Sequence, residues 1–336
     1  MTLPTPRGPV SESLFELLRH GSGSGDLSTA FDASPDPFTD EDLQLCLYVA
    51  YELHYRGFEG VDPGLEWDPA VLAMRAEAEA VFAEALEREA PRRADVDPGE
   101  VASLLFELAK SEDGPQLSRH LGSSGTDEQF REFVIHRSAY QLKEADPHSW
   151  AIPRLEGPAK AALVEVQFDE YGSGDPERVH ARLFADAMGA LGLDSSYGAY
   201  LDRLPAVTLA TVNVMSLFGL NRRWLGAIVG HLAMFEITSP EPNRRYANGL
   251  RRLGLESATE FFDEHVEADS IHENIAAHDM AGSLAKAQPE LGPDILFGAE
   301  CLLLLEARWA GELLSAWEEG RSSLREPGPL PEPAAA

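Results

Sequence analysis

The chain has 336 residues, of which 44% are hydrophobic and 25% charged, a composition that predicts a globular protein with one large core or two modest ones. Asp and Glu number 57 against 27 Lys and Arg, so the formal net charge is −30, and such a surface repels nucleic-acid phosphates and anionic membranes. Two distant cysteines, Cys46 and Cys301, exclude a disulfide framework, and without an apolar leader or a spanning apolar run the sequence predicts a cytoplasmic protein.

The two ends of the chain differ in composition from its middle. Residues 1–35 are rich in Gly, Ser, Pro and Thr and predict a flexible arm, in which SESLFELLRHG is expected to form one or two helical turns. The final REPGPLPEPAAA holds too much proline for a helix, so residues 321–336 are predicted to form a disordered tail.

Between these ends almost every signal is helical. Leu, Ala, Glu and Arg dominate, three Asp-Pro pairs place an N-cap before a first-turn proline, and Thr126 and Ser257 begin capping boxes. We therefore predict an all-α fold with a helical region at 36–125 and a helical core at 126–320. The expected helices cover about residues 40–56, 69–90, 98–110, 127–144, 157–171, 176–192, 206–219, 223–237, 243–252, 257–270 and 272–317, the last broken near Pro289 and Pro293.

Carboxylates end two of these helices. Glu144 closes the helix at 127–144, where an exposed terminal glutamate and an inward-facing ligand are both compatible with the pattern. Glu170 lies on the stripe that includes Leu163 and Gln167, and the turn GSGDP then leads to His180 near the start of the next helix. A tight turn would bring Glu170 and His180 to the same end of a helix pair, although local capping by Glu170 and an ordinary half-buried His180 remain alternatives.

Glu236 stands in the apolar stretch LGAIVGHLAMFEITSP, beside Phe235 and Ile237. A buried carboxylate there costs several kcal/mol unless it is paired, protonated or bound to a cation, and the C-terminal end of a helix disfavours negative charge further. A buried ion pair with an arginine such as Arg223 or Arg244 is the structural alternative to a ligand role.

The segment FFDEHVEADSIHEN places His265, Asp269 and His272 at helix positions i, i+4 and i+7, so these side chains leave one face within about 60° of one another. A half-exposed polar face would have the same pattern. Taken with the carboxylates on the other helices, the segment completes a set of oxygen and nitrogen donors without thiolate. Such donors suit iron or manganese in a helical bundle, although the Glu-x-x-His pairs of ferritin-like bundles are missing.

The order Glu, His, Glu, HxxxDxxH resembles the haem-oxygenase-like diiron oxidases and oxygenases, the iron-containing redox enzyme family. The similarity covers roughly residues 125–318 and is carried by QLKEADPHSWAIPRL, EVQFDEYGSGDPERVHARLF and EHVEADSIH. It implies a haem-oxygenase-like bundle of about seven core helices, two non-haem irons, Fe(II) in the reduced form, and O₂ as co-substrate. It also implies a helical dimerisation region within 36–125 and a homodimer.

Position by position, the resemblance implies a set of metal ligands and a class of reaction. An additional carboxylate at Glu144 resembles the one in N-oxygenating members and implies N-oxygenation of an amine or amino acid. Desaturation or oxidative C–C cleavage of an amino or fatty acid is the alternative, with an electron donor as a further partner. The implied ligands are Glu144, Glu170, His180, Glu236, His265, Asp269 and His272.

Three other functions remain open at this point. A thiaminase-like enzyme would need a cysteine nucleophile, but Cys46 and Cys301 both lie in apolar helical runs typical of packing residues. A haem site with one histidine would leave Glu236 and Asp269 without a purpose. A non-enzymatic helical binding or scaffold protein would use the polar interior as a salt-bridge network.

Overall fold

The computed structural model describes residues 1–21, 31, 35–110 and 114–326, with the side chains of 269 and 270 outside the description. These residues form helices joined by short turns, with no strand among them, which confirms the predicted all-α fold. The helices are α1 (Pro9–His20), α2 (Glu41–Glu52), α3 (Pro69–Glu89), α4 (Val101–Ala109), α5 (Leu117–Ser123), α6 (Asp127–Gln141), α7 (Asp146–Ser149), α8 (Gly157–Glu170), α9 (His180–Ala190), α10 (Ala206–Leu220), α11 (Leu225–Thr238), α12 (Pro240–Arg252), α13 (Glu260–Asn274), α14 (Ser283–Ala287) and α15 (Gly292–Glu318).

The largest differences between the observed and the expected helices are at four places, and the short helix α7 was also not predicted. The stretch predicted to form one or two turns is the full helix α1, and α5, which ends in a Gly- and Ser-rich segment, was not predicted. Helix α9 begins at His180 rather than at 176, because residues 175–178 close a turn with the Arg178 N–H donating to the Asp175 carbonyl. The expected break near 271 is absent: α13 continues through a π-helical segment, η7 (Ile275–Gly282), into α14.

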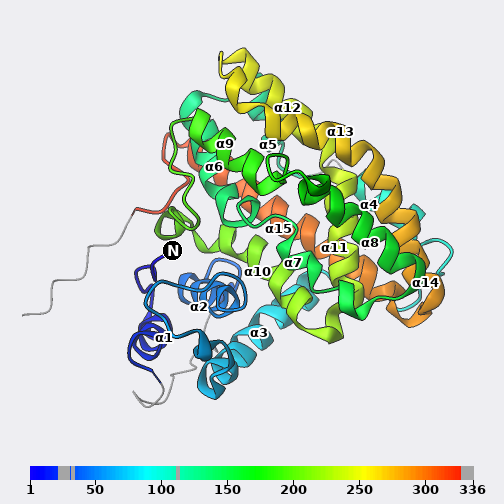
Figure 1. The fold of residues 1–336 in the computed structure, drawn as a ribbon, viewed down its shortest axis with the longest axis horizontal. Coiled ribbons are helices and arrows are strands. Elements are labelled where there is room, and N and C mark those ends of the chain that lie inside the picture. The colour runs from blue at the N-terminus through cyan, green and yellow to red at the C-terminus, as the bar shows by residue number, and fades with distance from the viewer. Residues whose placement is uncertain (22–30, 32–34, 111–113, 327–336) are drawn as a thin grey trace, which may run out of the picture.

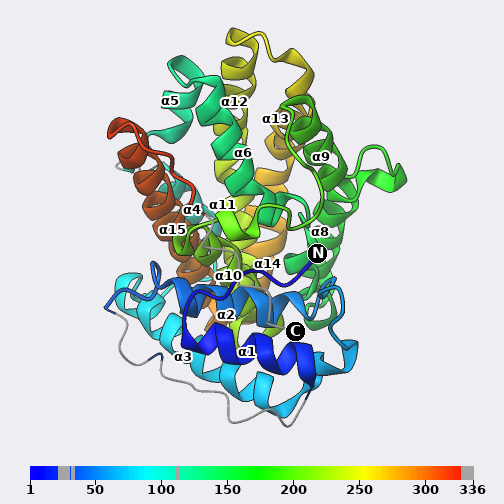
Figure 2. The ribbon, with the colours of Figure 1, turned by 90° about the vertical axis from the view of Figure 1, so that its left-hand side faces the viewer.

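Helices α1, α2 and α3 form a layer that lies across one end of an upright helical bundle (Figure 2). Every residue of α2 from Leu43 to Glu52 is buried, because this helix packs against α1, α3 and α10 at once. The side-chain amide of Asn213 on α10 donates to both the backbone and side-chain oxygens of Gln44 on α2. The layer is therefore joined to the bundle by apolar packing and by buried hydrogen bonds.

Within the bundle, α11 packs closely along α15. Gly230 and Gly298 allow this approach, since a Cβ atom at either position would overlap the backbone of the facing helix. Helix α11 also packs against α13, η7 packs against α8, and α13 packs against α9. Figure 1 shows α8, α11 and α13 in the right-hand part of the molecule, with α9 to their left. The arrangement brings the helices that carry the predicted donors together.

The buried apolar residues form two clusters. The larger one reaches from the N-terminal layer through α10, α11 and α15, and the smaller one joins α5, α6, α9, α12 and α13. Residues next to the predicted donors belong to both, with Val166 and Leu232 in the larger cluster and Phe184 and Phe261 in the smaller. None of the helices in the described part of the chain combines the length and apolarity needed to cross a bilayer.

Candidate metal centre

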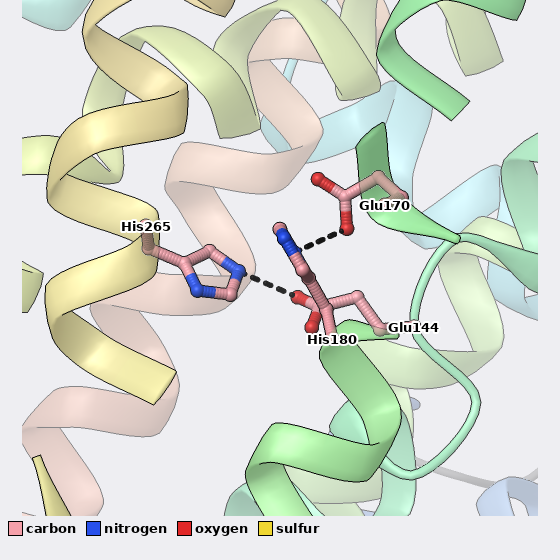
Figure 3. A group of neighbouring side chains, drawn as sticks. All are labelled: Glu144, Glu170, His180 and His265. Carbon is pink, nitrogen blue, oxygen red and sulfur yellow. Dashed lines mark ion pairs between the residues drawn. The ribbon is translucent and has the colours of Figure 1, made fainter. Parts of the chain in front are cut away.

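Glu170 and His180 meet across the turn between α8 and α9. Gly172 has φ +75°, and a Cβ atom there would lie 2.6 Å from the Val179 backbone nitrogen, so the turn requires glycine. The turn sets Glu170 Oε2 2.9 Å from His180 Nδ1, with both side chains buried (Figure 3). The proximity expected from the short GSGDP linker is therefore present in the structure.

Glu144 reaches the same place from the turn that follows α6. The next residue, Ala145, has φ +71°, and its carbonyl accepts a hydrogen bond from the Gln167 side chain on α8 at 3.0 Å. Glu144 is 7% exposed, which rules out the exposed terminal glutamate that the sequence left open. Burial raises the pKa of Glu144, while the nearby His265 acts in the opposite direction.

His265 on α13 faces Glu144, with its Nε2 atom 3.4 Å from Glu144 Oε1 (Figure 3). Its Nδ1 atom lies 2.8 Å from the Phe261 carbonyl oxygen, which can only accept, so Nδ1 carries a proton. In the neutral imidazole the lone pair is then on Nε2 and points toward the carboxylate. A cation between these atoms would satisfy both, and backbone-oriented imidazoles of this kind are common metal ligands.

His272 lies two turns further along α13 and has a carboxylate at each ring nitrogen. Its Nδ1 atom is 3.4 Å from Glu236 Oε2, and its Nε2 atom is 3.0 Å from Asp169 Oδ2. Partial burial raises the pKa of Asp169, but hydrogen bonds from Ser173 and His272 outweigh it, and the pKa is lowered. Asp169 therefore accepts a hydrogen bond from the Nε2–H of His272, and the lone pair on Nδ1 of the neutral ring then faces Glu236.

The donors form two groups that share one residue. Ligand atoms of Glu144, Glu170, His180 and His265 all lie within 4.8 Å of one another, and so do those of Glu170, Glu236 and His272. All six side chains are buried. Glu170 belongs to both groups, which is the position of a carboxylate able to bridge two metal ions.

The predicted donor Asp269 lies in α13, between His265 and His272, and its side chain is outside the described part of the structure. The arginines considered as partners of Glu236 lie elsewhere: Arg244 pairs with Glu241, and the Arg223 guanidinium stacks on Trp224. Glu236 instead has an imidazole neighbour, His272, on α13.

Several neighbours of the donors were not predicted. Asp169 lies about 100° around α8 from Glu170, and it hydrogen-bonds His272 because α8 packs against η7, the continuation of α13. Tyr140, Gln167 and His148 line a cavity of about 10 Å³ together with donors from both groups, which is room for about one water molecule. His148 is buried, and its Nε2 atom lies 3.2 Å from His231 Nδ1.

The donor set fits iron. Carboxylates and imidazoles without thiolate suit non-haem iron, and Glu144 Oε2 is a buried carboxylate oxygen with no hydrogen-bond partner in the described residues. Such an oxygen is costly to bury unless a cation neutralises it. The two groups could therefore hold iron through the same side chains that the sequence pattern selected.

Comparison with known proteins identifies a family for this chain. No curated protein matches the chain. The sequence model of the family described as iron-containing redox enzymes matches residues 131–307, just over half of the chain, and this range contains every predicted donor. The chain therefore belongs to the haem-oxygenase-like, iron-containing redox enzyme family.

Proposed function

We propose that this protein is a non-haem diiron oxygenase that uses O₂ to oxidise a small substrate, with N-oxygenation of an amine or amino acid as the favoured reaction. Family membership supports an iron-dependent oxidoreductase. The observation that carries the finer proposal is the presence of Glu170 in both donor groups. Two iron ions, when bound, would supply the electrons that activate O₂.

The chain would hold one ion through Glu144, His180 and His265 and the other through Glu236 and His272, with Glu170 between them. Asp269 is proposed as a further ligand from its position on α13. The second ring nitrogens of His265 and His272 are held by the Phe261 carbonyl and by Asp169, which fixes the orientation of both imidazoles.

Other residues would keep the reaction away from water. The walls around the donors come from the apolar clusters, with Leu232, Phe235 and Phe261 among the residues that line the adjoining cavities. N-oxygenation consumes one O₂, two electrons and two protons, and yields the N-hydroxy product and one water. These two electrons do not come from the substrate and require an external reductant, so we also propose an electron donor as a partner.

Glu144 supports N-oxygenation over the alternatives. With Glu144 the first group has four donors instead of three, and the proposed set has seven ligands instead of six; we expect the additional carboxylate to favour oxygen transfer to nitrogen. Without Glu144, the remaining six ligands would fit desaturation or C–C cleavage as well as they fit N-oxygenation. Glu144→Ala is therefore the variant that separates these reactions.

The test begins with anaerobic titration of the metal-free chain with Fe(II), followed by O₂. We expect about two irons per chain, a transient visible absorption after O₂ addition, and oxidised nitrogen in the product from a panel of amines and amino acids. Glu144→Ala should retain part of the iron and lose N-oxygenation. Uptake of no iron would favour the scaffold alternative, and unchanged N-oxygenation and iron content in Glu144→Ala would remove the basis for the favoured reaction.

A further inference from the structure

A cavity of about 220 Å³ adjoins the donor groups, with His265 in its wall. It is small for a ligand pocket, since these commonly occupy roughly 300–1,000 Å³. Much of its lining is aromatic, with side chains from α6, α9, α11 and α13. These include Phe133, Phe184, Phe235, Phe261 and Phe262. The cavity therefore suits a small ligand with an apolar portion.

One ion pair lines the same cavity. Arg137 on α6 and Glu306 on α15 form two parallel hydrogen bonds of 2.7 and 2.6 Å, and their side chains are 18% and 26% exposed. The Arg137 guanidinium also stacks over the Trp309 ring, with 3.9 Å between its central carbon and the ring centroid. The pair is therefore held in a fixed orientation while part of each partner stays accessible.

The Arg137–Glu306 pair also marks the border between this cavity and a second, outer one. The outer cavity occupies about 600 Å³ and is lined by residues of α12, of α15, and of α5 with the turn before it, including Gln116, Arg119 and Arg245. Arg137, Tyr246 and Glu306 line both cavities. A ligand that enters from the outer cavity therefore meets the ion pair before it reaches His265.

The pair retains hydrogen-bonding capacity of both signs. A guanidinium has five N–H donors, and the two bonds to Glu306 use two of them, while each carboxylate oxygen keeps a second lone pair. A lone carboxylate would be attracted by Arg137 and repelled by Glu306, and a lone ammonium would meet the reverse. Only a ligand with both charges gains from both partners.

Gln141 extends this polar edge toward the metal centre. It lies one helical turn after Arg137, lines the inner cavity, is 9% exposed, and its side-chain oxygen has no hydrogen-bond partner in the described part of the chain. A buried amide oxygen of this kind is costly unless a ligand N–H reaches it. Arg137, Gln141 and then Glu144 thus lead from the ion pair to the donors.

We infer that the inner cavity binds a zwitterionic α-amino acid, whose carboxylate and ammonium groups contact the Arg137–Glu306 pair and whose side chain extends between the aromatic walls toward the metal centre. That the bound amino acid is then oxidised as a substrate rests on the proposed function. Oxidation would then occur on the side chain, and N-oxygenation on a side-chain nitrogen. A fatty acid lacks the ammonium group and is disfavoured.

The test is a binding measurement that requires no turnover. The 336-residue chain, first metal-free and then loaded with Fe(II) without O₂, is titrated calorimetrically with two matched sets: L-phenylalanine, 3-phenylpropanoate and 2-phenylethylamine; L-leucine, 4-methylpentanoate and isoamylamine. In at least one set the amino acid should bind at least tenfold more tightly than both analogues. Binding of none, or no preference in any set, would overturn the inference.

Variants locate the preference. Glu306→Gln keeps the size of the side chain and removes its charge, so it should weaken amino-acid binding at least tenfold while the matched carboxylate binds equally well or better. Arg137→Gln should likewise weaken amino-acid binding at least tenfold, while the matched amine binds equally well or better. Glu300→Gln on the same helix is the control, because Glu300 pairs with Arg93 and does not line the cavity.

Two outcomes separate this inference from the proposed function. Equal weakening of amino acid and carboxylate in Glu306→Gln would show only a structural effect and would refute the zwitterion site. Melting temperatures identify a variant that fails to fold. If Arg137→Gln fails to fold, the binding data for Glu306→Gln alone decide whether the zwitterion site exists. Tight, charge-selective binding without any oxidation after iron and O₂ are supplied would refute the diiron oxygenase and leave the binding site in place.

Discussion

Lys143 and Glu144 are neighbours in the chain, yet their side chains enter two different buried polar clusters. Lys143 Nζ lies 3.0 Å from Glu52 Oε2, and the two side chains are 1% and 0% exposed. Tyr197 donates its hydroxyl to the same carboxylate, and the ammonium lies over the rings of Tyr48 and Tyr55. In this closed cluster each charge has its counter-charge inside the protein.

The cluster around Glu144 is composed differently. Its described members are three carboxylates and three imidazoles, and imidazole is a weak and conditional cation. The comparison shows how a structural cluster differs from a ligand-binding one: the first neutralises itself, whereas the second presents negative and lone-pair donors that a bound cation would complete. Changes to one cluster should therefore alter stability, and changes to the other should alter iron binding.

The largest expected effect is that of Glu170→Gln, which keeps the shape of the side chain but removes the charge that both donor groups share. We expect iron to fall from about two per chain to one or fewer and turnover to fall on the order of a thousand-fold, about 4 kcal/mol of barrier. Metal analysis and steady-state rates measure both. Glu165→Gln, on the exposed side of the same helix, should change neither, and two irons retained in Glu170→Gln would contradict the bridging position.

The closed cluster should respond in the opposite way. Lys143→Met leaves Glu52 buried without its counter-charge, so the free energy of unfolding should fall by about 3–5 kcal/mol. Denaturant titration measures this loss. Iron bound per folded chain should stay the same.

A second substitution tests the cause of that loss. Adding Glu52→Gln to Lys143→Met removes the uncompensated charge and should recover most of the stability, since Tyr197 can still donate to the amide oxygen. A loss of less than about 1 kcal/mol in Lys143→Met would show that Glu52 does not depend on Lys143 as its counter-charge, and a parallel loss of iron would show that the two clusters are not independent.

Gly172 tests the geometry that holds Glu170 beside His180. Gly172→Ala places a Cβ atom against the Val179 backbone at positive φ, and we expect about 2–3 kcal/mol of lost stability together with weaker iron binding by tenfold or more. Gly174→Ala is the matched control, because φ is also positive there and a Cβ atom would meet open space. If both variants bound iron equally, close approach at Gly172 would not position the donors.

The sequence predicted the parts of this arrangement that depend on local pattern. The all-α fold and most helix ranges follow from helix propensity and from capping residues such as Thr126, whose capping box is present in the structure. The expected proximity of Glu170 and His180 follows from the short linker between their helices. Their role as ligands stays a prediction.

Tertiary packing decided what the sequence did not predict. The Lys143–Glu52 pair joins residues that are 91 positions apart, and the Arg137–Glu306 pair joins residues 169 positions apart. No local pattern indicates such partners. The contact of Asp169 with His272 was not predicted for the same reason, because only the packing of α8 against the continuous α13–η7 helix brings the two side chains together.

His136 provides a buried imidazole outside both clusters. Burial lowers its pKa to about 3, with a smaller opposing effect of Glu132, whereas an unfolded histidine titrates near 6.5. The unfolded chain therefore binds one more proton between these values, so this residue's contribution to stability is complete above about pH 6.5 and is lost as the pH falls toward 3. The expected slope is about 1.4 kcal/mol per pH unit.

His136→Gln should remove that slope while it keeps hydrogen-bonding groups near Thr208 and Ser323. Denaturant titrations at several pH values between 4 and 7 measure the difference from the unsubstituted chain. His120→Gln is a suitable control, because His120 lies on α5, away from the bundle interior, with Gln129 as its partner. An unchanged slope in His136→Gln would show that the ring is not held neutral by burial.

The smallest expected effect concerns Ala145, which follows Lys143 and Glu144 in the chain. Its φ of +71° costs an L-residue about 1–2 kcal/mol, and glycine would remove this strain while adding about 0.5–1 kcal/mol of unfolded-state entropy. Ala145→Gly should therefore raise the free energy of unfolding by about 0.5–1 kcal/mol. Ala151→Gly, at an equally buried position with φ −75°, should lower it by a similar amount. The same sign for both variants would show that the Ala145 backbone is not strained, and the hydrogen bond from Gln167 to its carbonyl would then be enough to explain how Glu144 is directed away from Lys143.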